Sequence, residues 1–345
     1  YPQYDIVAAG SLLGVAVNRG KDANGDDFED TSIVRNESEE EFSFPVGKVD
    51  ELTLYPMDFE EFLWATDNHV LASKIREHYI KDEVMPGSVH KMALDLYQKY
   101  LVVGGMPECV KKFVDTYSYI ECRAVQQAIL NGYDADMSKY ATPATAVKIR
   151  ACWNSIPAQL AKENKKFQYK LIKSGARAYE YETAINWLNA SGIINQCTKI
   201  NEGKLPLSAF IEPESFKIYM GDVGLLCNKF GIPANIVIVE NDNMNDFKGA
   251  LAENYVCNSL VQCGLKPYYW ESNGKAEVDF VVQDKDGNII PIEVKSSIHT
   301  RSKSLNVFKS LYKIPYSIRI STKNFGFEND IKCIPLYSVF CLDNL

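Results

Sequence analysis

Hydrophobic and polar positions alternate most clearly near the C-terminal end of the chain, where two apolar runs of strand length flank a polar turn. Residues 276–282 have the sequence Ala-Glu-Val-Asp-Phe-Val-Val, and residues 289–295 have Ile-Ile-Pro-Ile-Glu-Val-Lys. Between them, at 284–288, stands Asp-Lys-Asp-Gly-Asn, and Asp-Gly is a strong turn signal. The pattern predicts a β-hairpin.

Charged residues stand at alternate positions in both predicted strands. Because successive side chains point to opposite faces, Glu277 and Asp279 share a face, and so do Glu293 and Lys295. Carboxylates gathered this closely repel one another unless a hard divalent cation lies among them, and oxygen ligands suit Mg²⁺ or Mn²⁺. Such an ion can activate water and stabilise charge on a phosphodiester, while Lys295 neutralises developing negative charge.

The spacing of Asp279, Glu293 and Lys295 resembles that of the PD-(D/E)xK nuclease superfamily. That superfamily often places an acidic residue on the helix before its first core strand. Glu253 fits that place, because residues 247–256 carry an apolar stripe of helical period. The resemblance therefore extends from the hairpin to the segment upstream of it.

This resemblance also implies functional roles. The implied metal ligands are Glu253, Asp279 and Glu293, with Glu277 as a substitute ligand, and the implied catalytic residues are Asp279, Glu293 and Lys295. The chain departs from the superfamily pattern at Val278, which stands where the superfamily name has proline. Two alternatives stay open: an ordinary half-buried hairpin with charges on its solvent face, and a nuclease-like domain that binds without cutting.

The remaining periodic segments predict a chain rich in helices. Asp58 is a candidate N-cap with Glu61 three residues on, and Asp222 is a candidate N-cap for a later helix. Helices are expected at 69–81, 88–101, 106–130, 143–153, 157–161, 178–190 and 304–313, and strands at 193–200, 316–321 and 335–340.

Three stretches in the first third of the chain resemble a prokaryotic family of AAA-type ATPases. They are Gly-Ser-Leu-Leu at 10–13, the run at 52–63 that contains Tyr-Pro-Met-Asp-Phe-Glu-Glu-Phe, and the run at 100–110 that contains Gly-Gly-Met-Pro. The family couples a P-loop module to a C-terminal domain related to the PD-(D/E)xK fold. The resemblance implies that Ser11 is a nucleotide sensor and that Lys48 stands where members often have arginine. A turn hydroxyl is the alternative for Ser11.

The Walker A phosphate loop is missing from the sequence. Residues 14–22 have one residue too many between their glycines and end in Asp22, whose carboxylate would repel phosphate. No Walker B strand precedes residue 4 either. The resemblance places both upstream of residue 1, so we expect a fragment that binds ATP only when that segment is present.

Together these features predict an α/β multidomain protein. Residues 1–140 would be the end of an AAA-type ATPase module with its helical lid, and residues 141–204 a winged-helix-like domain. Residues 205–345 would form a restriction-endonuclease-like α/β domain of the PD-(D/E)xK type.

Charge divides the chain. Residues 1–140 carry 13 basic and 25 acidic residues, a net of −12, and residues 141–345 carry 24 and 20, a net of +4, which together give −8. A mildly basic C-terminal part suits DNA, and a protein partner is the alternative. The candidate nucleic-acid contacts are Lys165, Lys166, Lys170, Lys173, Arg177, Arg301 and Lys303. Nothing in the sequence separates DNA from RNA or gives an oligomeric state.

The sequence predicts a cytoplasmic protein. Nine cysteines are scattered without a Cys-x-x-Cys pair, which is typical of free thiols in a reducing compartment. No apolar run reaches the roughly 18 residues that a membrane span requires, and no signal peptide is visible.

Overall fold

The structure is a computed structural model of the 345-residue chain, and it describes residues 50, 52–139, 141–238, 245–272, 276–295 and 303–345. The chain divides into two compact units. The first comprises residues 1–54, 131–155 and 169–194, and the second comprises residues 55–130, 156–168 and 195–345. The predicted boundaries after residues 140 and 204 stay a prediction.

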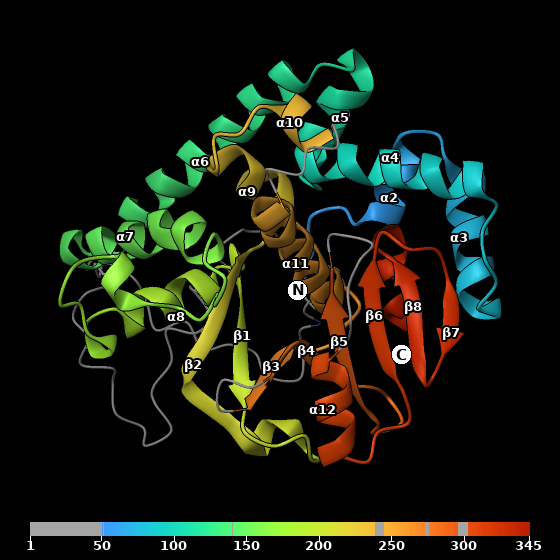
Figure 1. The fold of residues 1–345 in the computed structure, drawn as a ribbon. Helices are drawn as coiled ribbons and strands as arrows, with labels where there is room; N and C mark the ends of the chain where they lie inside the picture. Colours follow the sequence, from blue (N-terminus) through green and yellow to red (C-terminus); the bar gives the residue numbers. More distant parts are fainter. Residues whose placement is uncertain (1–49, 51, 140, 239–244, 273–275, 296–302) are drawn as a thin grey trace, which may run out of the picture. The chain divides into compact units, whose positions relative to one another are not determined.

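The architecture is mixed α/β, and an eight-stranded sheet is its centre within the described residues (Figure 1). The sheet order is β2-β1-β3-β4-β5-β6-β8-β7. The strands are β1 (Ile194–Ile200), β2 (Ile211–Met220), β3 (Tyr268–Ser272), β4 (Ala276–Gln283), β5 (Ile289–Val294), β6 (Ser317–Ser321), β7 (Gly326–Glu328) and β8 (Ile331–Pro335). The sheet is mixed: the pairs β1 with β3, β5 with β6 and β6 with β8 are parallel, and the pairs β3 with β4, β4 with β5 and β7 with β8 are antiparallel.

The predicted hairpin is confirmed. Strands β4 and β5 pair antiparallel, with Phe280 opposite Ile292 and Gln283 opposite Ile289. On its other side β4 pairs with β3, where Tyr268 lies opposite Val281 and Trp270 opposite Val278.

A β-bulge interrupts the pairing of β3 and β4. One residue of β3 lies between Tyr268 and Trp270, whereas two lie between Val278 and Val281 in β4, so β4 carries one extra residue there. The bulge puts Val278 and Val281 into one apolar cluster with Trp270, although period-two alternation would put them on opposite faces. The extra residue is Asp279 or its neighbour Phe280. A bulge at this point changes the direction in which the charged side chain of Asp279 projects.

Helices pack against this sheet. Helix α11 (Asn245–Gln262) contacts β2 and β5, and α12 (Lys303–Leu311) contacts β4 and β5. Leu305 and Phe308 of α12 lie in the apolar cluster of the sheet, and the Phe308 ring meets the Trp270 ring edge-on at 5.2 Å. Burial of these large side chains fixes the strands that carry the charged residues.

A helical group precedes the sheet in sequence and belongs to the same compact unit for most of its length. It contains α2 (Phe59–Ala65), α3 (His69–Lys81), α4 (Gly87–Val103), α5 (Pro107–Thr116) and α6 (Tyr119–Lys139). The capping box of α2 is confirmed, because Asp58 and Glu61 each accept the other's backbone N–H.

The single helix expected at 106–130 is wrong. Tyr117 has φ of 50°, in the left-handed region, and this ends α5 before α6 begins at Tyr119. Pro107 does occupy the first turn of α5, as predicted.

The next predictions also need correction. One helix, α7 (Pro143–Leu160), replaces the two expected at 143–153 and 157–161 and contains Pro157 within it. The helix expected at 178–190 begins as a short 3₁₀ turn, Ala178–Glu180, and continues as α8 (Glu182–Ala190). The following strand is present, but β1 lies between β2 and β3 of the large sheet, not in a separate small wing.

The C-terminal strand expected at 335–340 is also wrong. Strand β8 ends at Pro335, and residues Leu336–Asn344 form a 3₁₀ helix, η5, that contacts α3, α4 and α11. Asp222 caps the short helix α9 (Val223–Lys229), as predicted, by accepting the N–H of Leu225 at 2.8 Å. Within the part of the chain that is described, no helix has both the length and the apolar character needed to cross a membrane.

Candidate functional site

The structure brings together the four charged residues that the sequence singles out. Helix α11 supplies Glu253, β4 supplies Asp279, β5 supplies Glu293, and Lys295 follows directly after β5. The Asp279 carboxylate accepts the backbone N–H of Val294 at 2.8 Å, and the Lys295 ammonium group lies 3.2 Å from Glu293 Oε1. The side chain of Asp279 thus takes the place of a backbone partner where the β4–β5 ladder ends.

A fifth residue, Lys165, reaches this group from the segment that follows α7. Its Nζ lies 2.5 Å from Glu253 Oε1, and the two side chains are only 12% and 10% exposed. The Tyr219 hydroxyl on β2 donates to Glu253 Oε2 at 3.3 Å. Both oxygens of Glu253 therefore have donors from the chain itself.

Lys217 on β2 is a second unexpected cation. It is 1% exposed, forms an ion pair with Glu277, and lies 5.0 Å from the centre of the Tyr269 ring. A lysine this deeply buried stays charged only when carboxylates compensate it. We call Glu253, Glu277, Asp279, Glu293, Lys165, Lys217 and Lys295 the charge cluster.

Burial and neighbouring charge shift the protonation of the carboxyl groups in opposite directions. Burial, with the Glu253 carboxylate adding to it, raises the pKa of Asp279 to about 7 against the opposing effect of Lys217 and Lys295. Burial alone would also raise the pKa of Glu253, but Lys165 and Lys217 outweigh it, and that pKa is lowered. At neutral pH Glu253 is therefore ionised and Asp279 is about half protonated.

Lys217 and Lys295 both keep their positive charge. Burial lowers the pKa of Lys217, but Glu253, Glu277 and Asp279 outweigh it and raise the pKa. The pKa of Lys295 is raised in the same way, with burial opposed by Asp279 and Glu293. The charge cluster holds four carboxyl groups and three ammonium groups, so its net charge is −1, or zero when Asp279 is protonated.

One oxygen in the charge cluster has no donor. Glu293 is 3% exposed, and its Oε2 is buried without a hydrogen-bond partner among the described residues, whereas Oε1 pairs with Lys295. A buried carboxylate oxygen left this way is costly and is common at functional sites.

The predicted metal ligands do not fit a metal ion as they stand. Within the described ranges, no group of three or more His, Cys, Asp or Glu side chains is arranged to hold one. The physical reason lies in the charge cluster, where Lys165 already pairs with Glu253 and Lys295 with Glu293.

The other predicted site residues do not join this group. Ser11, Lys48 and Arg301 lie outside the described residues. Lys166 is half-buried, and the exposed residues are Lys170, Lys173, Arg177 and Lys303 at the start of α12. Lys165, predicted as a phosphate contact, instead lies in the charge cluster.

Sequence reasoning missed Lys217 and Tyr219. One signal was available: Lys217 interrupts the apolar run Phe-Lys-Ile-Tyr-Met at 216–220, and a lysine inside a buried strand requires a carboxylate partner. That partner is Glu277, which lies 60 residues away in the chain, and no local sequence pattern identifies it.

Comparisons with known proteins find two domains. Residues 94–235 match the family model described as Domain of unknown function (DUF8612), and residues 248–339 match Domain of unknown function (DUF4143). No curated protein and no solved structure matches the chain. A DUF4143 domain, which is often found C-terminal to AAA ATPase modules, is therefore present, and it contains Glu253, Asp279, Glu293 and Lys295.

Proposed function

We propose that this chain is the non-catalytic binding part of an AAA-type ATPase, a nucleotide-regulated switch or scaffold. The observation that carries this proposal is that the chain's own lysines pair with Glu253, Glu277 and Glu293, the carboxylates that a metal-dependent nuclease would leave for its ion. ATP would bind in the phosphate-loop module to which DUF4143 domains are often attached.

The electrostatics disfavour metal binding in this arrangement. Three ammonium groups offset most of the charge of the four carboxyl groups, so the repulsion that makes a cluster of acids bind a divalent cation is weakened. A metal ion would have to displace Lys165 from Glu253.

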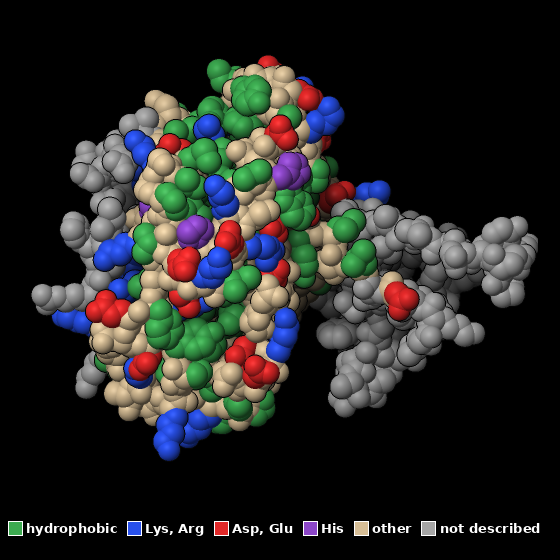
Figure 2. All heavy atoms as spheres, turned by 90° about the vertical axis from the view of Figure 1, so that its right-hand side faces the viewer, with side chains coloured by type: hydrophobic (Ala, Val, Ile, Leu, Met, Phe, Trp, Pro, Cys, Tyr) green, Lys and Arg blue, Asp and Glu red, His purple; other side chains and the backbone are tan. Residues whose placement is uncertain are grey.

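A protein is the partner that the described surface suits better than a nucleic acid. The net negative charge lies in residues 1–140, at −12, whereas residues 141–345 carry +4, an excess too small to attract a polyanion strongly. The helical group exposes large apolar side chains, among them Val70 at 72%, Ile80 at 75% and Val84 at 67%. Basic and acidic side chains alternate with apolar ones on the face shown in Figure 2. All nine cysteines are free thiols, which suits the cytoplasmic location that we propose with this function.

A second candidate function is metal-dependent phosphodiester cleavage in DNA. The unpartnered Glu293 Oε2 favours it, because that oxygen lies beside Lys295 in a PD-(D/E)xK-like arrangement with Asp279. Mg²⁺ or Mn²⁺ would supply an activated water there. Because the residues as arranged do not fit the ion, we assign no catalytic step to it.

Cleavage assays separate the two candidates. The chain is incubated with supercoiled plasmid, single-stranded DNA and RNA in Mg²⁺ or Mn²⁺, beside Asp279→Asn and the control Glu202→Gln, which changes an exposed ion pair with Lys204. The non-catalytic proposal expects equal background in all three proteins. Cutting by the wild type and Glu202→Gln that Asp279→Asn abolishes would instead establish the nuclease.

A further inference from the structure

We infer that Lys165 is a built-in counter-cation that takes the place of a divalent metal ion in the charge cluster, and that its removal uncovers a latent Mg²⁺ or Mn²⁺ site. The inference deepens the proposed non-catalytic function by identifying what keeps the site free of metal. It rests on three separate features of the structure: the contact, the anchoring of the segment and an unpartnered oxygen.

The first feature is the contact itself. Lys165 Nζ and Glu253 Oε1 lie 2.5 Å apart, and both side chains are nearly excluded from solvent. Tyr219 already donates to the second oxygen of Glu253, so Oε1 is the atom that remains for a cation. The ammonium group holds that position.

The second feature is that the backbone around Lys165 is held in place by its own contacts. The position of the ammonium group beside Glu253 is therefore fixed by the fold. The Phe167 N–H donates to Phe216 O of β2 at 2.8 Å, and the two rings stack with centres 5.4 Å apart. Gln168 and Gln159 exchange two hydrogen bonds, of 2.9 and 3.0 Å. The segment is thereby tied to β2 and to the end of α7.

The third feature is the unpartnered Glu293 Oε2, which belongs to a side chain that is 3% exposed. Its other oxygen, Oε1, lies 3.2 Å from the Lys295 ammonium group. Glu293 Oε2 is thus an acceptor in the charge cluster that no donor among the described residues satisfies.

The balance of charge predicts the effect of removing Lys165. Four carboxyl groups and the two remaining lysines would give a net charge of −2, and one divalent cation restores zero. Mutual repulsion of the uncovered carboxylates is the usual reason that such groups bind Mg²⁺ or Mn²⁺. Replacement by methionine keeps most of the apolar side chain, which becomes one atom shorter, and removes the charge together with its N–H donors.

The test compares the full wild-type chain with Lys165→Met and with Lys162→Met, which removes an exposed lysine from the same segment. Thermal unfolding and calorimetry are measured with MnCl₂ alone. We expect the melting temperature of Lys165→Met to fall by about 5 °C without metal and to recover as Mn²⁺ is added. Its affinity for Mn²⁺ should exceed that of the wild type and Lys162→Met by at least about tenfold.

A double variant gives the specific control. Lys165→Met with Glu253→Gln should lose the gained Mn²⁺ response, because the uncovered carboxylate is gone. If Lys165→Met does not fold alone, its folding yield with and without Mn²⁺ is the readout: recovery supports the inference, and no recovery overturns it.

Equal Mn²⁺ responses in the wild type and Lys165→Met would overturn the inference about Lys165. That result leaves the proposed function standing as long as the wild type cuts no nucleic acid. Cleavage by the wild type would contradict the proposed function, whatever Lys165→Met does. The two failures are therefore distinguishable.

Discussion

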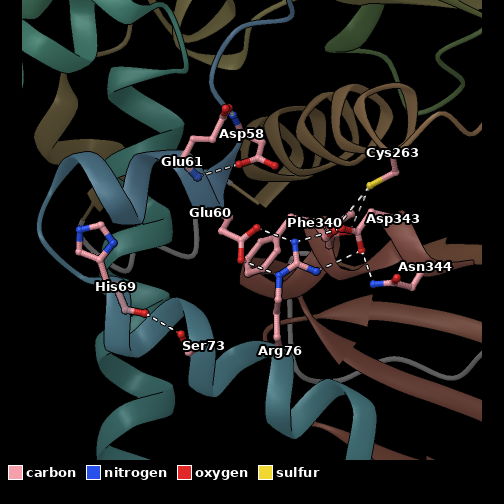
Figure 3. Close-up of polar contacts among 11 residues, drawn as sticks. Asp58, Glu60, Glu61, His69, Ser73, Arg76, Cys263, Phe340, Asp343 and Asn344 are labelled. Atoms are coloured by element: carbon pink, nitrogen blue, oxygen red, sulfur yellow. Dashed lines mark hydrogen bonds and ion pairs between the residues drawn. The ribbon is translucent and has the colours of Figure 1, made fainter.

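Two ionic clusters in the same compact unit are built in different ways. In the first, the Arg76 guanidinium of α3 donates to both oxygens of Glu60, at 2.6 and 2.5 Å, and to Asp343 of η5 at 3.1 Å (Figure 3). The plane of Arg76 also lies 5.1 Å from the Phe340 ring. The charge cluster beside the sheet uses lysines instead and leaves one carboxylate oxygen without a donor.

The difference separates a structural tie from a candidate site. A guanidinium group matches carboxylates with fixed, planar geometry, so the Arg76 cluster joins two helices to the C-terminal segment with both Glu60 oxygens satisfied. Its hydrogen bonds to Glu60, against the opposing effect of burial, raise the pKa of Arg76. In the charge cluster, Asp279 is partly protonated and Glu293 incompletely bonded, which are features typical of sites that handle a ligand.

The largest expected effect comes from Lys217→Met. The change removes a fully buried charge and leaves Glu277 without its partner beside Glu253 and Asp279, so the free energy of unfolding should fall by about 3–5 kcal/mol. Urea unfolding at pH 7.5 measures it. Lys204→Met, which breaks an exposed pair with Glu202, should leave stability unchanged; an equal loss in both variants would contradict the role of Lys217.

A smaller, pH-dependent effect is expected from Asp279→Asn. The pKa of Asp279 is raised to about 7 in the folded protein, against an ordinary value near 4 in the unfolded chain. The folded protein keeps a proton that the unfolded chain releases, so this group's contribution to stability is complete below pH 4 and is lost as the pH rises through 7.

Asparagine cannot ionise and should escape that loss. The stability of Asp279→Asn relative to the wild type should therefore rise between pH 5 and 8, by about 2 kcal/mol, as measured by urea unfolding at several pH values. A difference that stays constant over this range would show that Asp279 titrates normally.

The smallest effect is expected from Arg76→Lys. Lysine keeps the charge but loses the paired hydrogen bonds to Glu60 and the contact with Phe340, which should cost about 1 kcal/mol in urea unfolding. Lys81→Met on the same helix breaks an exposed pair with Glu77 and should have no effect. A loss of unfolding free energy in Arg76→Lys as large as that in Lys217→Met would contradict the proposed distinction between the two clusters.

Sequence reasoning succeeded where the determinants are local. The turn at 284–288, the capping box of Asp58 and the cap of Asp222 each depend on residues a few positions apart, and all three are present. The convergence of Asp279, Glu293 and Lys295 follows from alternation along two adjacent strands.

The failures have tertiary causes. The left-handed backbone of Tyr117 divides the helix expected at 106–130, although the apolar pattern continues through it. The helix η5 replaces the strand expected at 335–340, in a segment whose residues 336–342 are all buried. The metal prediction stays a prediction, and no sequence pattern indicated two of the cations that meet its carboxylates. Lys165 and Lys217 reach the cluster from 88 and 60 positions away in the chain.

The origin of those two lysines bears on how the chain can be divided. Lys165 and Lys217 lie in the segment that matches DUF8612, whereas Glu253, Glu277 and Glu293 lie in the segment that matches DUF4143. An expression fragment limited to residues 248–339 would carry Glu253 and Glu277 without Lys165 and Lys217, while Glu293 would keep Lys295. Two lysines of one matched segment are thus coupled to acids of the other, and a change of Glu253 or Glu277 should be tolerated best when its lysine partner changes with it.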